Sequence, residues 1–141
     1  MIDLTNYLPP DEDLIVSARR ALMALTENVI TTNDDNNVEF PQIIVGVQND
    51  IDQPDFKNAN QMRYTLKVDI YVDLDEAFIG MRMRRVVEKL LTKLQLERYA
   101  SRYVPGSLSS PTLEDNSTSR PLWHGVILLD YLLIFMKEEE I

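Results

Sequence analysis

The chain has 141 residues, 45% of them hydrophobic, and a formal net charge of −9 at pH 7, which fits one compact domain, residues 1–141, with its own core. It has no cysteine and a single histidine, which excludes disulfides, thiolate metal sites and histidine-rich zinc sites within one chain. No signal-peptide pattern and no apolar run of bilayer length is present, so we expect neither secretion nor membrane insertion.

Residues 11–32 carry apolar side chains at helical spacing, which predicts the first helix. Pro10 suits its first turn, and the three acidic residues that follow lie where the positive end of the helix dipole favours carboxylates. The polar run over residues 31–37 should end the helix in an exposed loop.

Two strands are expected next. Residues 40–49 are rich in β-branched side chains, and Pro41 is tolerable near a strand start or at a sheet edge. Residues 64–72 alternate apolar and polar side chains, so one face of this strand should be buried. Between them, residues 50–61 look too long and polar for a tight turn, which predicts a protruding, mobile loop.

Residues 73–96 predict the second helix, in which Asp73 and Glu76 have the spacing of a capping box. Arg84 is placed to pair with Glu88. The apolar stripe that should face the core consists of Ile79, Met83, Val86, Val87, Leu90, Leu91 and Leu94.

Residues 105–121 contain three prolines and five serines, which predicts a long connection or mobile arm. Residues 122–136 are apolar on both parities and fit a long strand covered on both faces, with residues 102–104 as a further short strand. The fold class is therefore α+β: an antiparallel sheet with two helices packed on one face and long protruding loops.

Charge is distributed unevenly. Residues 81–103 hold seven basic and two acidic side chains, a net charge of +5, so the rest of the chain carries −14. The row Arg82, Arg85, Lys89 and Lys93, called the basic face below, is either a solvated helix surface or a contact with an acidic surface. The negative total opposes general adhesion to nucleic acid, so we expect no specific nucleic-acid binding, although DNA could pass through an acidic lumen.

Each of the other candidate sites has a structural explanation as well as a functional one. Asp50, Asp52 and Asp55 could hold a hard cation or form a solvated acidic cluster. The carboxylates near residue 73 could serve acid–base chemistry, but helix capping explains them. His124 is either a general base or a hydrogen-bonded strand histidine, and no glycine-rich phosphate loop is present.

The closing strand also needs a cover for its second face, which includes Leu132 and Ile134. One possibility is that a helix and the long connection provide it within the chain. The other is a neighbouring subunit.

The order of these elements resembles that of the tail terminator proteins of long-tailed bacteriophages, also called tail-to-head joining or minor tail completion proteins. The resemblance rests on the strand Leu66-Lys67-Val68-Asp69-Ile70-Tyr71-Val72, the helix containing Met83-Arg84-Arg85-Val86-Val87-Glu88-Lys89-Leu90-Leu91, and the closing Leu122-Trp123-His124-Gly125-Val126. It implies a structural virion protein, made in the host cytoplasm, without enzyme activity or cofactor. Such a protein forms a ring, a hexamer by resemblance, between the tail tube protein and a head-completion or connector protein.

On this hypothesis, charge and burial place the subunit contacts at the basic face, the closing strand and the acidic loop, that is, at Arg82, Arg85, Lys89, Lys93, Asp50, Asp52, Asp55, Leu132 and Ile134. The alternatives are a monomeric or dimeric adaptor that uses the basic face on an acidic partner, and a metal-dependent enzyme built on the three aspartates.

Overall fold

The computed structural model describes residues 3–31, 39–56, 59–115 and 121–136, with backbone only for residues 49–56, 59–60, 113–115 and 135–136. Its elements in chain order are helix α1 (Pro10–Leu22), strands β1 (Val29–Ile30), β2 (Gln42–Phe56) and β3 (Ala59–Asp73), the 3-10 helix η1 (Leu74–Glu76), helix α2 (Ala77–Thr92), and strands β4 (Ala100–Tyr103), β5 (Thr112–Asp115) and β6 (Leu122–Met136).

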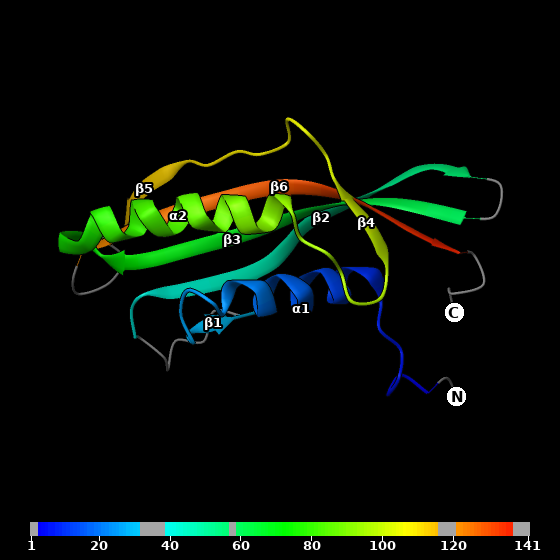
Figure 1. The fold of residues 1–141 in the computed structure, drawn as a ribbon, viewed down its shortest axis with the longest axis horizontal. Coiled ribbons are helices and arrows are strands. Elements are labelled where there is room, and N and C mark those ends of the chain that lie inside the picture. Colours follow the sequence, from blue (N-terminus) through cyan, green and yellow to red (C-terminus); the bar gives the residue numbers. More distant parts are fainter. Residues whose placement is uncertain (1–2, 32–38, 57–58, 116–120, 137–141) are drawn as a thin grey trace.

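The strands form one sheet in the order β1-β2-β3-β6-β4, with β5 also paired to β6. All pairings are antiparallel except that of β1 with β2. Helices α1 and α2 contact each other and pack on the same side of the sheet (Figure 1). The α+β prediction is confirmed, and the two-residue β1 makes the sheet mixed rather than purely antiparallel.

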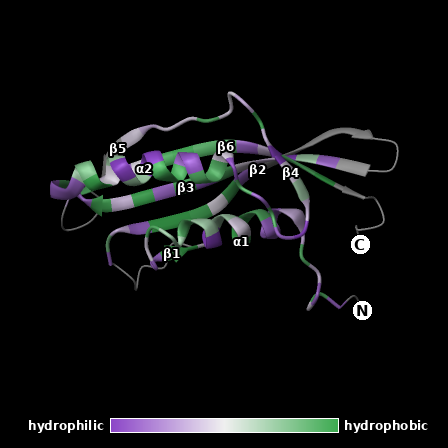
Figure 2. Ribbon diagram, viewed as in Figure 1, coloured by the Kyte–Doolittle hydropathy of each residue, from purple (hydrophilic) through white to green (hydrophobic). Residues whose placement is uncertain are grey.

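The core lies between the helices and one face of β3 and β6. Alternate residues of β3, including Leu66 and Val68, are fully buried, and their register partners Leu129 and Ile127 on β6 are buried with them. Strand β6 is predominantly hydrophobic where it passes beneath α2 (Figure 2). The helices contribute Leu14, Ala18, Leu22, Met83, Val87 and Leu91 to the same cluster. The predicted alternation of β3 is confirmed.

Helix α1 begins as predicted, with Pro10 in the first turn, but it ends at Leu22 rather than near residue 32. A turn follows, and Val29 then joins the sheet beside Ile43. The error arose because Leu25 and Val29 continue the helical spacing, although β-branched side chains also suit a sheet edge.

Asp13 has a structural role that the dipole argument missed. Its side chain is fully buried, and its Oδ2 accepts hydrogen bonds of 3.0 Å from the backbone N–H groups of both Arg98 and Tyr99. Ser17 donates to Oδ1 at 3.4 Å and accepts from the N–H of Glu97. Together these bonds tie α1 to the segment between α2 and β4.

The predicted protruding loop over residues 50–61 is wrong, because its described residues belong to a long hairpin. Strand β2 continues to Phe56, β3 begins at Ala59, and β6 pairs with β3 along its whole length. These three strands extend past the helices as an arm (Figure 1). The aspartate, asparagine and proline residues of this segment have low strand propensity, which explains why its sequence looked like a loop.

The predicted loop over residues 105–121 is also partly wrong. Ser109 pairs with Leu128, and Thr112–Asp115 forms β5 against the start of β6, while residues 116–120 lie outside the description. The short strand expected at residues 102–104 is present as β4, one to two residues earlier. The segment from β4 to β5 therefore follows one edge of β6, with a turn at Pro105 and Gly106 in which the Ser107 N–H donates to the Val104 carbonyl.

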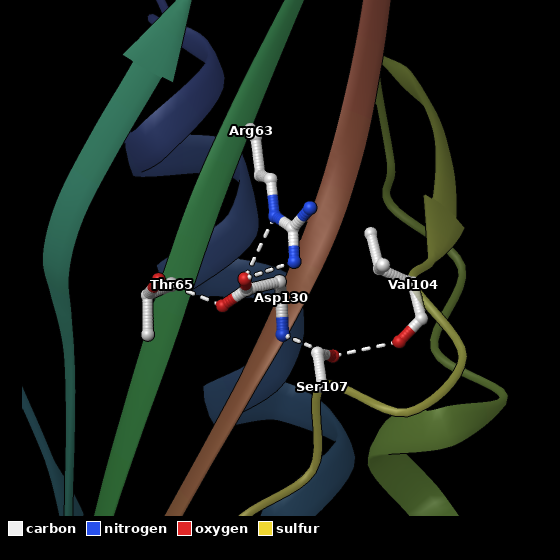
Figure 3. A network of polar contacts seen from close by, with 5 residues as sticks. All are labelled: Arg63, Thr65, Val104, Ser107 and Asp130. Carbon is white, nitrogen blue, oxygen red and sulfur yellow. Dashed lines mark hydrogen bonds and ion pairs between the residues drawn. The ribbon is translucent and has the colours of Figure 1, made fainter.

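Side-chain hydrogen bonds link this turn to β6 and β3 (Figure 3). The Asp130 N–H donates to Ser107 Oγ at 2.9 Å, and Ser107 Oγ donates to the Val104 carbonyl at 2.7 Å. The Asp130 carboxylate accepts from Arg63 Nε at 2.8 Å and from Thr65 Oγ1 at 2.7 Å. Asp130 of β6 thus connects β3 with the turn after β4.

The start of α2 differs from the capping-box prediction. Asp73 occupies the position before η1 but forms no side-chain capping bond there, and α2 begins only at Ala77. Helix α2 approaches β6 closely because Gly80 lies against the ring of the buried Trp123. A Cβ added to Gly80 would lie 2.4 Å from Trp123 Cε3, and one added to Gly125 would lie 2.6 Å from the same ring.

Candidate functional site

The basic face lies on the solvent side of α2. Arg82, Arg85, Lys89 and Lys93 are all exposed, because the buried residues of this helix occupy the opposite side. Arg85 Nη1 lies 4.0 Å from Glu88 Oε1, with 76% of the arginine side chain exposed, so this pair neutralises little of the local charge.

Arg84 does not belong to the basic face. The predicted pair of Arg84 with Glu88 is wrong, because Glu88 lies near Arg85 instead. Arg84 Nη1 donates to the Ser110 carbonyl and to Thr112 Oγ1, and its guanidinium lies 5.7 Å from the Trp123 ring centroid. These contacts attach α2 to the segment leading into β5, which is a structural role.

A groove of about 620 Å³ lies between α1 and the last part of α2 with the segment that follows it. It is called the interhelical groove below. Ala21, Leu90 and Leu94 give it apolar walls, while Lys89 and Lys93 bring two members of the basic face to its rim. Arg20 and Glu97 also line it and form an ion pair with each other. The groove therefore combines apolar surface with two lysines that form no ion pair with any residue that the structure describes.

Part of the predicted apolar stripe is exposed. Ile79 is 43% and Val86 39% exposed, whereas Met83, Val87 and Leu91 face the core. Phe78 is 75% exposed, the largest exposed fraction among the large hydrophobic residues of the described part of the chain. Helical spacing did not identify Phe78 as a candidate contact residue, because Phe78 lies outside the predicted apolar stripe. A large apolar side chain on the solvent side of a helix is itself a signal of a contact with another molecule.

Leu132 and Ile134 lie within the sheet and are half-buried. Both residues are on β6 between β3 and β4, with Leu132 in register with Arg63 and Arg102. Their parity is opposite to that of the core residues of β6, so they belong to the face without helices. A neighbouring subunit as their cover remains a prediction.

The same helix-free face carries a polar cluster. His124 Nε2 lies 2.7 Å from Asp69 Oδ1, the His124 ring stacks on Tyr71 at 4.2 Å between centroids, and Lys67 Nζ lies 3.9 Å from Asp69 Oδ2. The reading of His124 as a hydrogen-bonded strand histidine is confirmed.

The backbone of Asp50, Asp52 and Asp55 forms part of β2, but their side chains lie outside the description. Asp50 is in register with Tyr64 and Asp52 with Met62. Elsewhere in the described chain, no three Asp, Glu or His side chains gather as metal ligands would. The roles suggested for these three aspartates stay predictions.

No helix in the described residues has the length and apolar character required to cross a membrane. Comparisons with models of known protein families and with curated proteins both returned no match.

Proposed function

We propose that this chain is a structural subunit that assembles into a ring at the head-proximal end of a phage tail. The ring caps the tail tube, ends its polymerisation and joins the tail to the head. The observation that carries the proposal is an exposed cationic helix face beside an apolar groove, on a chain with a net charge of −9. This surface suits an acidic protein surface, and a second copy of the chain offers one.

Two further features support a subunit role. The arm of β2, β3 and β6 projects beyond the helices, as a segment that reaches a neighbour would (Figure 1). The resemblance to tail terminator proteins rests on an order of helix, strand, protruding loop, strand, helix, long loop and closing strand. The described chain has its main helices and long strands in this order, with a hairpin in place of the first loop.

A basic face and acidic surfaces elsewhere on the same chain favour head-to-tail contacts, which close into a ring when the rotation between subunits permits. The resemblance suggests six subunits. The tail tube protein would dock on one side of the ring and a head-completion or connector protein on the other. DNA would pass through the lumen without specific binding, and the assembly requires no cofactor or enzyme activity.

Light scattering after size-exclusion chromatography, with negative-stain imaging, tests this proposal. We expect rings, alone or with tail tube subunits, that weaken as salt rises because the contacts are partly electrostatic. Arg85→Glu combined with Lys89→Glu should weaken assembly and leave the far-UV circular dichroism unchanged. A particle that stays monomeric at high protein concentration and with tube subunits contradicts the proposal. A stoichiometric complex without a ring would instead favour the adaptor function.

A further inference from the structure

The two ends of α2 present complementary surfaces. Phe78, Ile79 and Met81, called the apolar tip, are 75%, 43% and 44% exposed. Asp75 and Glu76, immediately before them, are exposed too and add negative charge to the tip. Large apolar side chains grouped on a surface and bordered by charge are typical of a protein contact.

The interhelical groove has the opposite electrostatic character. Lys89 and Lys93 stand at its rim, and its one acidic lining residue, Glu97, is engaged by Arg20. Its apolar walls suit an apolar side chain, and about 620 Å³ falls within the size range of pockets that proteins use for ligands. The apolar tip therefore matches the groove in both polarity and charge.

The tip and the groove of one molecule cannot meet. Phe78 precedes Lys89 by eleven positions on the rigid helix α2, so the two lie about 16 Å apart along its axis. A contact between them requires two molecules. Because it joins two different surfaces, it repeats head to tail and generates a ring or an open filament.

We propose that the apolar tip of one subunit inserts into the interhelical groove of a second copy of this chain, with Asp75 and Glu76 facing Lys89 and Lys93. This inference rests on the proposed self-assembly and names the contact that would drive it. Phe78 supplies the buried anchor, and the charges set the register of the contact and the rate of association.

Two variants test the contact, each altering one half of it. Phe78→Ser removes the anchor and leaves the groove intact, while Lys89→Glu with Lys93→Glu reverses the charge of the groove and leaves the tip intact. Each variant alone should assemble more weakly. The protein concentration at which its assembly dissociates on dilution should be roughly 10- to 100-fold higher than for the unmodified chain, as expected for loss of an interface anchor or a charge pair.

Mixing the two variants gives the sharper result. The intact groove of one variant accepts the intact tip of the other, and the two altered surfaces prevent any further addition, so the 1:1 mixture should form a heterodimer and nothing larger. Arg98→Glu is the control, because it reverses the charge of an exposed residue that belongs neither to the basic face nor to the residues that line the groove. It should leave assembly nearly unchanged.

Unchanged circular dichroism and Trp123 emission would establish that each variant folds, and Met81→Ser provides a second tip variant. Rings that persist in the Phe78 or double-lysine variants overturn the inference while leaving the ring itself standing. Failure of the mixture to form a heterodimer also overturns it, as does a groove that captures only the tail tube protein. An open filament with the same variant pattern supports the contact and refutes the ring.

Discussion

The packing of Gly80 against Trp123 leads to a prediction in which two effects oppose each other. Within a helix, Gly→Ala normally stabilises by about 1 kcal/mol, because glycine loses more backbone entropy on folding. At position 80 the added methyl would lie 2.4 Å from Trp123 Cε3 and 2.6 Å from Cζ3. The ring is buried, and Gly125 lies against it as well. It has little space into which to move.

Overpacking of this kind costs about 1–3 kcal/mol, so Gly80→Ala should reduce the free energy of unfolding by about 1 kcal/mol after the helix-propensity gain is subtracted. With a urea dependence of about 2 kcal/mol/M, the unfolding midpoint should fall by about 0.5 M. Emission from Trp123, the single tryptophan of the chain, follows both the unfolding transition and the displacement of its ring.

Gly46→Ala provides the matched control, because nothing lies within 4 Å of the position that its Cβ would occupy. Its midpoint should stay unchanged or rise, since glycine weakens a strand interior. If Gly80→Ala were as stable as the unmodified chain, with the same tryptophan emission, the ring would have room for a methyl group and the packing argument would be refuted.

Two further predictions concern buried polar groups. Asp13→Ala should lower the free energy of unfolding by about 2–5 kcal/mol in urea titrations, because it leaves two buried N–H groups without their acceptor. Asp11→Ala, at an exposed position, is the control and should have little effect. Equal losses of stability in the two variants would contradict the structural role of Asp13. Burial raises the pKa of Tyr131 above its ordinary value of 10.0, so the folded chain keeps this proton where the unfolded chain releases it. Stability should therefore decline above about pH 10. Tyr131→Phe, which loses a 2.6 Å hydrogen bond to the Leu91 carbonyl, should cost about 1 kcal/mol at pH 7 and reduce that decline; an unaltered pH profile would count against the assignment.

Periodicity predicted the elements that are buried on one side. The alternation in β3 was sufficient because each core residue, such as Leu66, lies between polar neighbours that face away from the helices. Periodicity was insufficient where the same spacing of apolar residues fits both a helix and a strand. Val29 continues the helical spacing of α1 but pairs with Ile43 at the sheet edge, a choice made by tertiary contacts rather than by local sequence.

The candidate site was only partly predictable for a similar reason. Arg82, Arg85, Lys89 and Lys93 follow from helical spacing within one element. The interhelical groove depends on how α1 approaches α2, since Arg20 and Lys93 are 73 positions apart in the sequence. Ser107 looked like part of a flexible serine-rich connection, and its hydrogen bond to the Asp130 N–H arises only when that connection follows β6.

The position of β6 also constrains when this chain can fold. It is the last strand along the described chain, yet it lies inside the sheet, between β3 on one side and β4 and β5 on the other. During synthesis, β3, β4 and β5 therefore cannot form their pairings with β6 until residues 122–136 have been translated. Folding that depends on such distant pairings is slow and cooperative. A nascent chain that has not yet released β6 from the ribosome consequently lacks a complete sheet until translation of this strand is finished.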